Sequence, residues 1–180
     1  MAAYPAEIIS LIASDVPNDD IETIASGPTV LDSSTVVDAN AILTKYGIEG
    51  AGVEFIETQK DEKYFKRVTN MLILSNKDAL SAMSGEATRR GYTATIADER
   101  FTGEARDIGR AIVENLHSAP SKTAFLYAGE STVTISSGAG NGGRNQEMAL
   151  SVLSDIRDDE IILPFASDGH DNTEHAGAIA

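Results

Sequence analysis

The sequence predicts an α/β fold in which helices cover the faces of a layered, largely parallel sheet. Strand-like runs and helical patterns alternate over the second half of the chain. This order places each helix against one face of a parallel sheet. A hydrophobic content of 42% is sufficient for a sizeable core. One further run, residues 131–135, alternates threonine with valine and isoleucine, which predicts a half-exposed strand that adds an antiparallel member to the sheet.

Five segments carry the alternation. Strands are expected at 71–74, 92–97 and 123–128, and helices are expected at 77–90 and 102–116. The first of these helices ends with two arginines before Gly91, which is typical of a helix C-terminus. Thr102 is expected to cap the second helix.

The first part of the chain begins with an apolar run at 7–14, which is expected to form a buried strand. The acidic turn that follows contains Asp15 and Asp19, and carboxylate oxygens of this kind can hold Mg²⁺. The alternative is an acidic surface turn. Next, Ser26 and Thr29 flank a Gly-Pro pair that breaks any helix, and their hydroxyl and N–H groups can bind a phosphate or carboxylate. The alternative is an ordinary turn.

A helix is expected after this turn, capped by Ser33 or Ser34 and stopped by Gly47. Residues 49–67 have no clear periodicity and are expected to form a linker. The sequence thus predicts a boundary near Arg67, with domains at 1–66 and 67–180.

The stretch from Ser136 to Glu147 contains four glycines within six positions. A helical pattern follows it, with Ala149, Leu150, Leu153 and Ile156 on one face. A Gly-rich turn that opens a helix presents unpaired N–H groups and the positive end of the helix dipole, which bind anions. Arg144 falls in the first helical turn, where its guanidinium can bind a phosphate or carboxylate bidentately. The alternative is a flexible, solvent-exposed connection.

Two known nucleotide-site motifs, the P-loop and the dinucleotide-binding pattern, are not matched by the chain. No lysine follows a glycine in the chain, which excludes a P-loop. Gly138, Gly140 and Gly143 have the dinucleotide-site spacing, but the preceding run at 131–135 is not the buried apolar strand that such a site requires.

A last buried strand is expected at 160–165, and it leads into an acidic loop at 167–177. In this loop Asp168 and Asp171 can bind a metal ion or act as a general base. His170 and His175 could join a zinc site, with solvent-facing histidines of no special role as the alternative.

The charge balance excludes several classes of partner. The chain has 14 Lys and Arg against 28 Asp and Glu, a net charge of −14, which repels nucleic acid and anionic membranes. It has no cysteine, and therefore no thiolate nucleophile or disulfide. A soluble cytoplasmic protein without a membrane segment is expected.

Two motifs in the first half, ISLIASDVPNDD at 9–20 and IASGPTV at 24–30, resemble the first domain (DUF4147) of the glycerate 2-kinase family. Three motifs in the second half resemble that family's second domain, the MOFRL domain. They are GESTVTI at 129–135, GGRNQE at 142–147 and SDGHD at 167–171. The resemblance implies a two-domain α/β enzyme that phosphorylates D-glycerate at its 2-hydroxyl with ATP. Some relatives are called hydroxypyruvate reductases, so an NAD(P)H-dependent reductase stays open as an alternative.

The resemblance implies ATP and Mg²⁺ as cofactors and D-glycerate as the substrate, with a homodimer as a further expectation. The expected catalytic residues are Arg144, Asp168 and Asp171, and the expected metal ligands are Asp15, Asp19 and Asp168. The expected nucleotide and substrate contacts are Ser26, Gly27, Thr29, Gly129, Glu130, Ser131, Gly142, Gly143, Asn145 and Glu147. Glu130 and Glu147 are also expected to orient Arg144.

Some features depart from the family pattern. Tyr127 and Ala128 stand where the family has Ser-Gly before Gly129 and Glu130, and the final acidic loop is one residue shorter than usual. Family members are longer than this chain and carry a lysine segment and a final loop that it lacks. The chain is therefore expected to be an interior portion of the enzyme, an inactive, anion-binding fragment when isolated.

Overall fold

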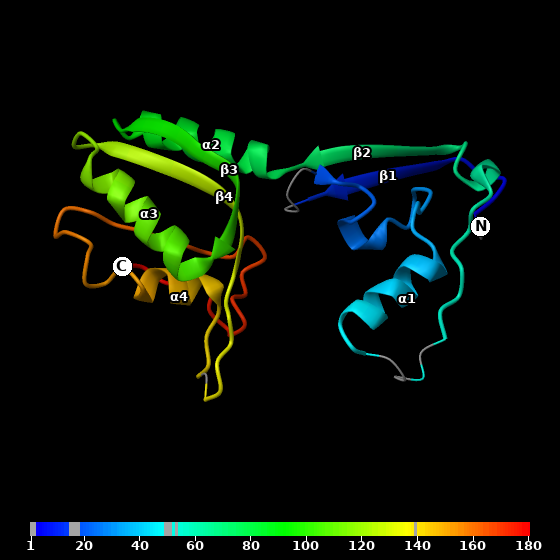
Figure 1. Ribbon diagram of the computed structural model, residues 1–180. Helices are drawn as coiled ribbons and strands as arrows, with labels where there is room; N and C mark the ends of the chain where they lie inside the picture. The colour runs from blue at the N-terminus through cyan, green and yellow to red at the C-terminus, as the bar shows by residue number, and fades with distance from the viewer. Residues whose placement is uncertain (1–2, 15–18, 49–51, 53, 139) are drawn as a thin grey trace. The chain divides into compact units, whose positions relative to one another are not determined.

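The computed structural model describes residues 3–14, 19–48, 52, 54–138 and 140–180. These residues form two compact units. The first contains residues 3–14 and the described residues of 19–73, and the second contains those of 74–180. The predicted α/β class is confirmed, because both units combine strands with helices (Figure 1).

The first unit is built on a two-stranded sheet. Strands β1 (Ile8–Ala13) and β2 (Val68–Leu74) pair and run in the same direction (Figure 1). In the sequence, the two strands are separated by the 3₁₀ helix η2 (Ile24–Ser26), the helix α1 (Val36–Lys45) and the 3₁₀ helix η3 (Glu62–Tyr64).

Helix α1 begins with a reciprocal cap at Thr35, one or two residues later than expected from the sequence. The Thr35 hydroxyl accepts a hydrogen bond from the Asp38 backbone N–H, and the Asp38 carboxylate accepts one from the Thr35 backbone N–H. The expected cap at Ser33 or Ser34 is wrong. The Ser34 hydroxyl instead donates to Asp32 over 2.7 Å, in the loop before the helix.

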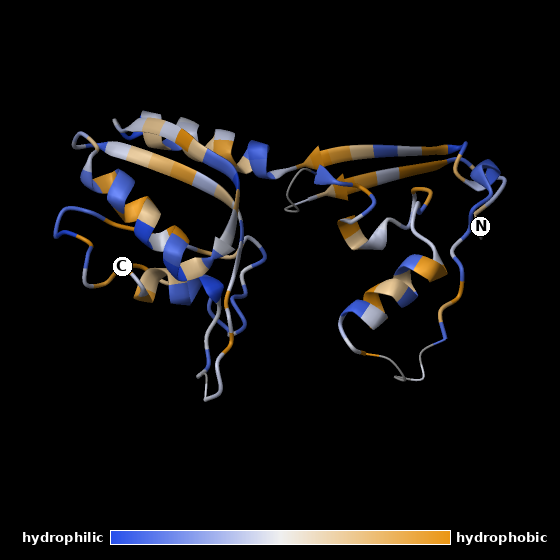
Figure 2. Cartoon of the chain, viewed as in Figure 1, coloured by the Kyte–Doolittle hydropathy of each residue, from blue (hydrophilic) through white to orange (hydrophobic). Residues whose placement is uncertain are grey.

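The second unit contains a parallel pair of strands with helices on both faces. In chain order it holds α2 (Asn76–Arg89), β3 (Thr93–Glu104), α3 (Ala105–His117), β4 (Thr123–Thr132) and α4 (Arg144–Leu150). Strands β3 and β4 pair in parallel, with α2 on one side and α3 with α4 on the other (Figure 1). Hydrophilic and hydrophobic residues alternate along α3, as expected of a helix with one face on the sheet (Figure 2).

Both strands of this pair are longer than the sequence indicated. Strand β3 continues through Asp98 and Arg100 with two register irregularities, so Thr102 lies within the strand and Glu104 is the residue that precedes α3. A regular ladder disfavours polar residues such as Asp98 and Arg100, and register irregularities of this kind let them remain in the strand.

The structure does not show the separate antiparallel strand that was expected at 131–135. Strand β4 continues to Thr132 in parallel with β3, and residues 133–135 lie outside the strands. The reason is a close approach at Gly129, where an added Cβ would lie 2.2 Å from the carbonyl oxygen of Phe101. Glycine therefore lets β4 stay against β3 beyond the expected end.

An antiparallel pairing occurs instead near the C-terminus. Ile162 and Ala180 exchange backbone hydrogen bonds of 3.0 and 3.1 Å, Ala178 donates to Pro164, and Ala166 donates to Ala176. The buried strand expected at 160–165 is wrong, because Ile161 and Leu163 are exposed while Ile162 and Pro164 are buried. Pro164 has no N–H group, so the ladder is incomplete and only Phe165 and Gly177 form a bridge.

The core of the second unit lies between α3 and the segments that follow α4. Val113, Val152 and Ile162 pack together there. Gly109 brings α3 close to α4, since an added Cβ would lie 2.9 Å from the carbonyl oxygen of Met148. The face expected after the Gly-rich stretch is partly wrong, because Leu150 and Leu153 are 63% and 57% exposed. The buried residues of this segment are Met148, Ala149 and Val152, and of these only Ala149 belongs to the expected face.

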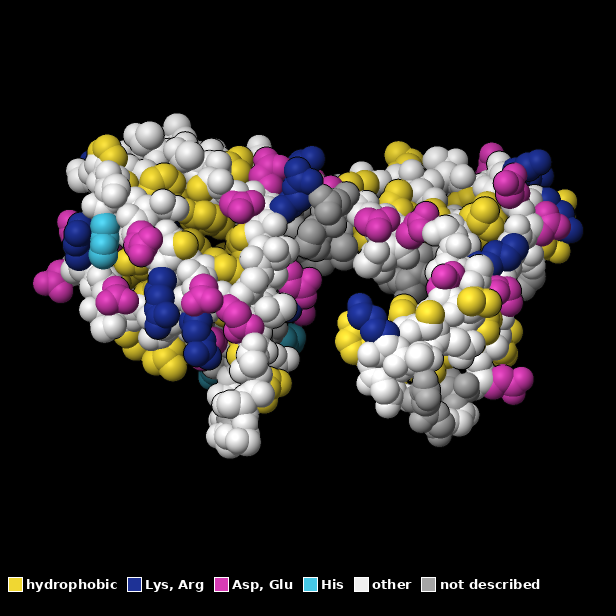
Figure 3. All heavy atoms as spheres, viewed as in Figure 1, with side chains coloured by type: hydrophobic (Ala, Val, Ile, Leu, Met, Phe, Trp, Pro, Cys, Tyr) yellow, Lys and Arg dark blue, Asp and Glu magenta, His cyan; other side chains and the backbone are white. Residues whose placement is uncertain are grey.

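Acidic side chains outnumber basic ones in the chain, and they are spread over both units in Figure 3. No helix within the described ranges has the length and hydrophobicity that a membrane crossing requires.

Candidate functional site

The start of α4 is closed by a carboxylate from the acidic loop. Asp171 is 3% exposed, and its carboxylate accepts hydrogen bonds from the backbone N–H groups of Asn145 and Gln146 over 3.1 and 2.8 Å. These amides belong to the first helical turn, which has no partners within its own helix. The anion that binds at this helix start is therefore part of the chain.

Side chains strengthen this contact. The Asn145 side-chain amide donates to Asp171 Oδ1 over 3.2 Å. The Gln146 amide donates to the Asp171 carbonyl oxygen and to the Thr173 hydroxyl. Among the described residues, five hydrogen bonds thereby join the acidic loop to the Gly-rich stretch. Both segments could be identified as candidate sites from the sequence, but no local pattern indicated that they contact each other.

Arg144 lies at the same helix start but points to β4. Its Nη1 lies 2.7 Å from Glu130 Oε1 and 3.4 Å from the Ser131 carbonyl oxygen. The side chains of Arg144 and Glu130 are 43% and 51% exposed. In the part of the chain that the structure describes, Nη1 is the only guanidinium nitrogen of Arg144 with a protein acceptor. The expected orientation of Arg144 by Glu130 is consistent with this geometry.

Glu147 has a different partner from the expected one. Its carboxylate lies 3.0 Å from Nη2 of Arg106 in α3, so it does not orient Arg144. Arg106 was missed by the sequence analysis. The available signal was its position in the first turn of a helix, where a cation is disfavoured unless an acid neutralises it.

Glu104 holds the base of the Gly-rich stretch. Thr134 donates its hydroxyl to Glu104 Oε1 over 2.6 Å and its backbone N–H to Oε2 over 3.2 Å. Both hydrogen bonds lower the pKa of Glu104, because they favour its charged form. The bond from the Thr134 hydroxyl has the larger effect. No feature of the sequence pointed to this residue.

The acidic loop presents Asp168 to solvent. Its Oδ1 accepts a hydrogen bond of 3.0 Å from the backbone N–H of His170, and the residue is exposed. The loop is closed at its base by the pairing of 162–166 with 176–180, and Asp171 donates its backbone N–H to the His175 carbonyl oxygen. Asp168 is thus carried by a loop that is fixed on both sides.

The described residues contain no group of three or more acidic or histidine side chains that could hold a metal ion. The zinc site considered at His170 and His175 is therefore not assembled. Of the expected Mg²⁺ ligands, Asp15 lies outside the described residues, Asp19 belongs to the first unit and Asp168 to the second. That set stays a prediction.

The turn around Gly27 has an unusual backbone. Ala25, Ser26 and Gly27 have φ values of 50°, 63° and 57°, and the two non-glycine residues are strained in this left-handed region. The Ser26 N–H, which was expected to be open to a ligand, donates to the Thr23 carbonyl oxygen. The Thr29 hydroxyl donates to Asn70 over 2.6 Å. The turn is thus held by a hydrogen bond within it and by one to Asn70 in β2.

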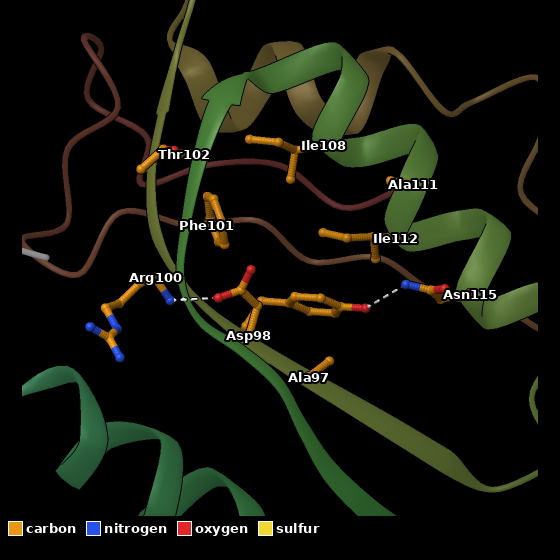
Figure 4. Close-up of a pocket in the computed structure, with 10 residues that line it drawn as sticks. Ala97, Asp98, Arg100, Phe101, Thr102, Ile108, Ala111, Ile112 and Asn115 are labelled. Carbon is orange, nitrogen blue, oxygen red and sulfur yellow. Dashed lines mark hydrogen bonds between the residues drawn. The ribbon is translucent and has the colours of Figure 1, made fainter.

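A separate cavity of about 480 Å³ lies between β3 and α3 (Figure 4). Phe101, Ile108 and Ile112 form apolar walls, and the Asn115 amide donates to the Tyr127 hydroxyl over 3.3 Å. None of the catalytic, nucleotide-binding or metal-binding residues expected from the sequence lines it. The candidate site is therefore the assembly of Arg144 and Glu130 with Asp168 and Asp171 of the acidic loop.

Two family models match the chain. The model described as "Domain of unknown function (DUF4147)" matches residues 1–57, and the model described as "MOFRL family" matches residues 123–180. The second range contains the Gly-rich stretch, α4 and the acidic loop.

Individual proteins are similar over nearly the whole chain. A glycerate 2-kinase of Pyrococcus horikoshii is 39% identical, covering 95% of this chain and 43% of its own. A protein named putative hydroxypyruvate reductase from Agrobacterium vitis is 36% identical, with coverages of 99% and 44%. A crystal structure of glycerate kinase from Thermotoga maritima matches with a TM-score of 0.74 at 32% identity, covering 98% of this chain and 45% of that one. The chain spans less than half the length of each of these proteins.

Proposed function

Because this chain belongs to the glycerate 2-kinase family, we propose that the whole protein transfers the γ-phosphoryl group of ATP to the 2-hydroxyl group of D-glycerate. The observation that carries the proposal is the half-exposed guanidinium of Arg144, held beside the Gly-rich stretch in a chain of net charge −14. Phosphoryl transfer depends mainly on positioning and on neutralising phosphate charge. A local cation supports this role, because the field of the remaining chain repels anions.

In this proposal, Arg144 binds the substrate anion, which is either a nucleotide phosphate or the glycerate carboxylate. Its present partner, Glu130, is a half-exposed carboxylate. Exposed ion pairs of this kind contribute about 1 kcal/mol or less, so a substrate anion can replace Glu130 at small cost. The remaining guanidinium N–H groups supply the planar fork that a phosphate or carboxylate binds.

In this proposal, Asp168 is the general base that accepts the proton of the substrate hydroxyl. It is exposed, and a carboxylate within hydrogen-bond reach of that hydroxyl can accept its proton. A single exposed carboxylate also fits Mg²⁺, which binds one or two carboxylates together with substrate phosphates and water. When bound, Mg²⁺ would neutralise charge on the nucleotide phosphates.

The same proposal includes domains at 1–66 and 67–180, a cytoplasmic location, and Asp15 and Asp19 as further Mg²⁺ ligands. The other proposed nucleotide and substrate contacts are Ser26, Gly27, Thr29, Gly129, Ser131, Gly142, Gly143 and Asn145.

Two assays on the full-length protein test the function. With D-glycerate, ATP and Mg²⁺, we expect formation of 2-phosphoglycerate and ADP in equal amounts, followed by a coupled assay. With hydroxypyruvate and NADH in place of these substrates, we expect no change in absorbance. NADH oxidation without ADP formation would replace the kinase by a reductase, the activity in the name of the Agrobacterium vitis relative.

A further inference from the structure

A buried carboxylate is unusual in a chain with so many exposed acids. Asp171 is 3% exposed, and its side chain accepts three hydrogen bonds, from the Asn145 and Gln146 backbone N–H groups and from the Asn145 amide. A buried charge needs such partners, because its desolvation is otherwise costly. The donors leave little capacity for a further ligand.

The contact fixes the backbone on both sides of Arg144. Before it, Gly143 lies so close to Asp171 that an added Cβ would come within 2.3 Å of the Asp171 Cγ. After it, Asn145 and Gln146 donate to the carboxylate. The Arg144 guanidinium then reaches Glu130, its partner at the end of β4. The place from which the Arg144 side chain starts is therefore determined by Asp171.

We propose that Asp171 is a positioning residue, which orients Arg144 for the substrate anion and does not touch the substrate. The inference rests on the proposed function in one respect, namely that Arg144 contacts the reacting molecules. Asp171 is not suited to be the base, because it is buried and both of its carboxylate oxygens already accept hydrogen bonds from α4. Its part is to keep the first turn of α4 in one place.

A double-mutant cycle in the full-length enzyme tests this role. Asp171→Asn keeps the shape of the side chain and removes its charge, and we expect kcat/KM to fall about tenfold to a hundredfold through misplacement of Arg144. If Asp171 acts through Arg144, adding Asp171→Asn to Arg144→Lys should cost much less than it costs in the wild type. Full additivity, or an unchanged kcat/KM in Asp171→Asn, would overturn the proposal.

Two further variants keep the test decisive. Glu174→Gln removes a charge from an exposed residue of the same loop and should leave kcat/KM unchanged. If Asp171→Asn does not fold, Gln146→Ala takes its place in the cycle, because it removes the donor to the Asp171 carbonyl oxygen. We then expect a smaller loss with the same coupling to Arg144→Lys, and additivity again overturns the proposal.

Amide hydrogen exchange separates this proposal from the kinase assignment. A wild-type protein that forms no ADP would refute the proposed function alone. In that case the peptide covering residues 143–150 is measured without ligands. Faster exchange there in Asp171→Asn, with unchanged exchange in Glu174→Gln, supports the positioning role. Equal exchange in both variants refutes it.

Discussion

An added Cβ on Gly143 would lie 2.2 Å from the carbonyl oxygen of Asp171. The backbone of Gly143 is extended, with φ −134°, so any residue could adopt it and the contact alone requires glycine. Gly143→Ala should therefore cost about 1–3 kcal/mol through overpacking. Gly140→Ala is the matched control, because no described atom beyond its chain neighbours lies within 4 Å of the added Cβ. Chemical unfolding of both variants measures this difference, and equal stabilities would contradict it.

Replacing Arg144 should affect catalysis far more than stability. In the full-length enzyme, Arg144→Ala should reduce kcat/KM roughly a hundredfold or more, as for other preorganised groups that bind developing charge. Arg144→Lys should recover only part of this, because a point charge does not replace a planar fork. The melting temperature should change little, because the pair with Glu130 is half-exposed. An Arg144→Ala enzyme that is destabilised but fully active would make the residue a structural clamp.

Val152 and Leu153 are neighbours with opposite environments. Val152 is 0% exposed and packs with Val113 and Ile162, whereas Leu153 is 57% exposed. Val152→Ala should lower the free energy of unfolding by about 2 kcal/mol, from lost burial and the cavity left behind. Leu153→Ala should change it by about 0.5 kcal/mol or less. Urea unfolding of the two variants compares them directly, and the reverse order would restore the helical face expected from the sequence.

Asp32 should make stability depend on pH in a narrow acidic window. Its pKa is lowered from 3.8 to about 2, first by the hydroxyl of Ser34 and then by the backbone N–H of Ser34 and the hydroxyl of Thr58. Because the folded-state pKa is the lower one, this stabilisation is complete above about pH 4 and is lost as the pH falls toward 2. Asp32→Asn should therefore reduce the loss of stability between pH 4 and pH 2. An unchanged pH profile in the variant would show that Asp32 does not contribute.

The helices of the second unit were predictable because their signals are local. Gly91 follows α2 as expected, and the alternation of strands and helices gives the parallel pair. The end of α4 was not predictable. The apolar pattern of the sequence continues through Leu153 and Ile156, whereas the helix ends at Leu150. Thr102 failed as a cap because β3 continues past it, supported by a partner strand that local propensity does not include.

The candidate site shows the same limit. Arg144 and the acidic loop could be singled out from their composition. The hydrogen bond between Asp171 and Gln146, in contrast, joins residues 25 positions apart, for which the sequence carries no periodic signal. The pairing of Glu147 with Arg106 likewise depends on how closely α3 and α4 pack at Gly109. Such contacts are set by tertiary packing.

The distance along the chain between α4 and Asp171 has a consequence for biosynthesis. A helix of seven residues is marginal by itself, and the first turn of α4 obtains its acceptor from a residue that is translated later. While the nascent chain ends before residue 171, the N–H groups of Asn145 and Gln146 have only water as a partner. On the ribosome, the strands and helices of the second unit up to β4 can thus pack first. The turn that carries Arg144 becomes fixed only when the acidic loop has emerged.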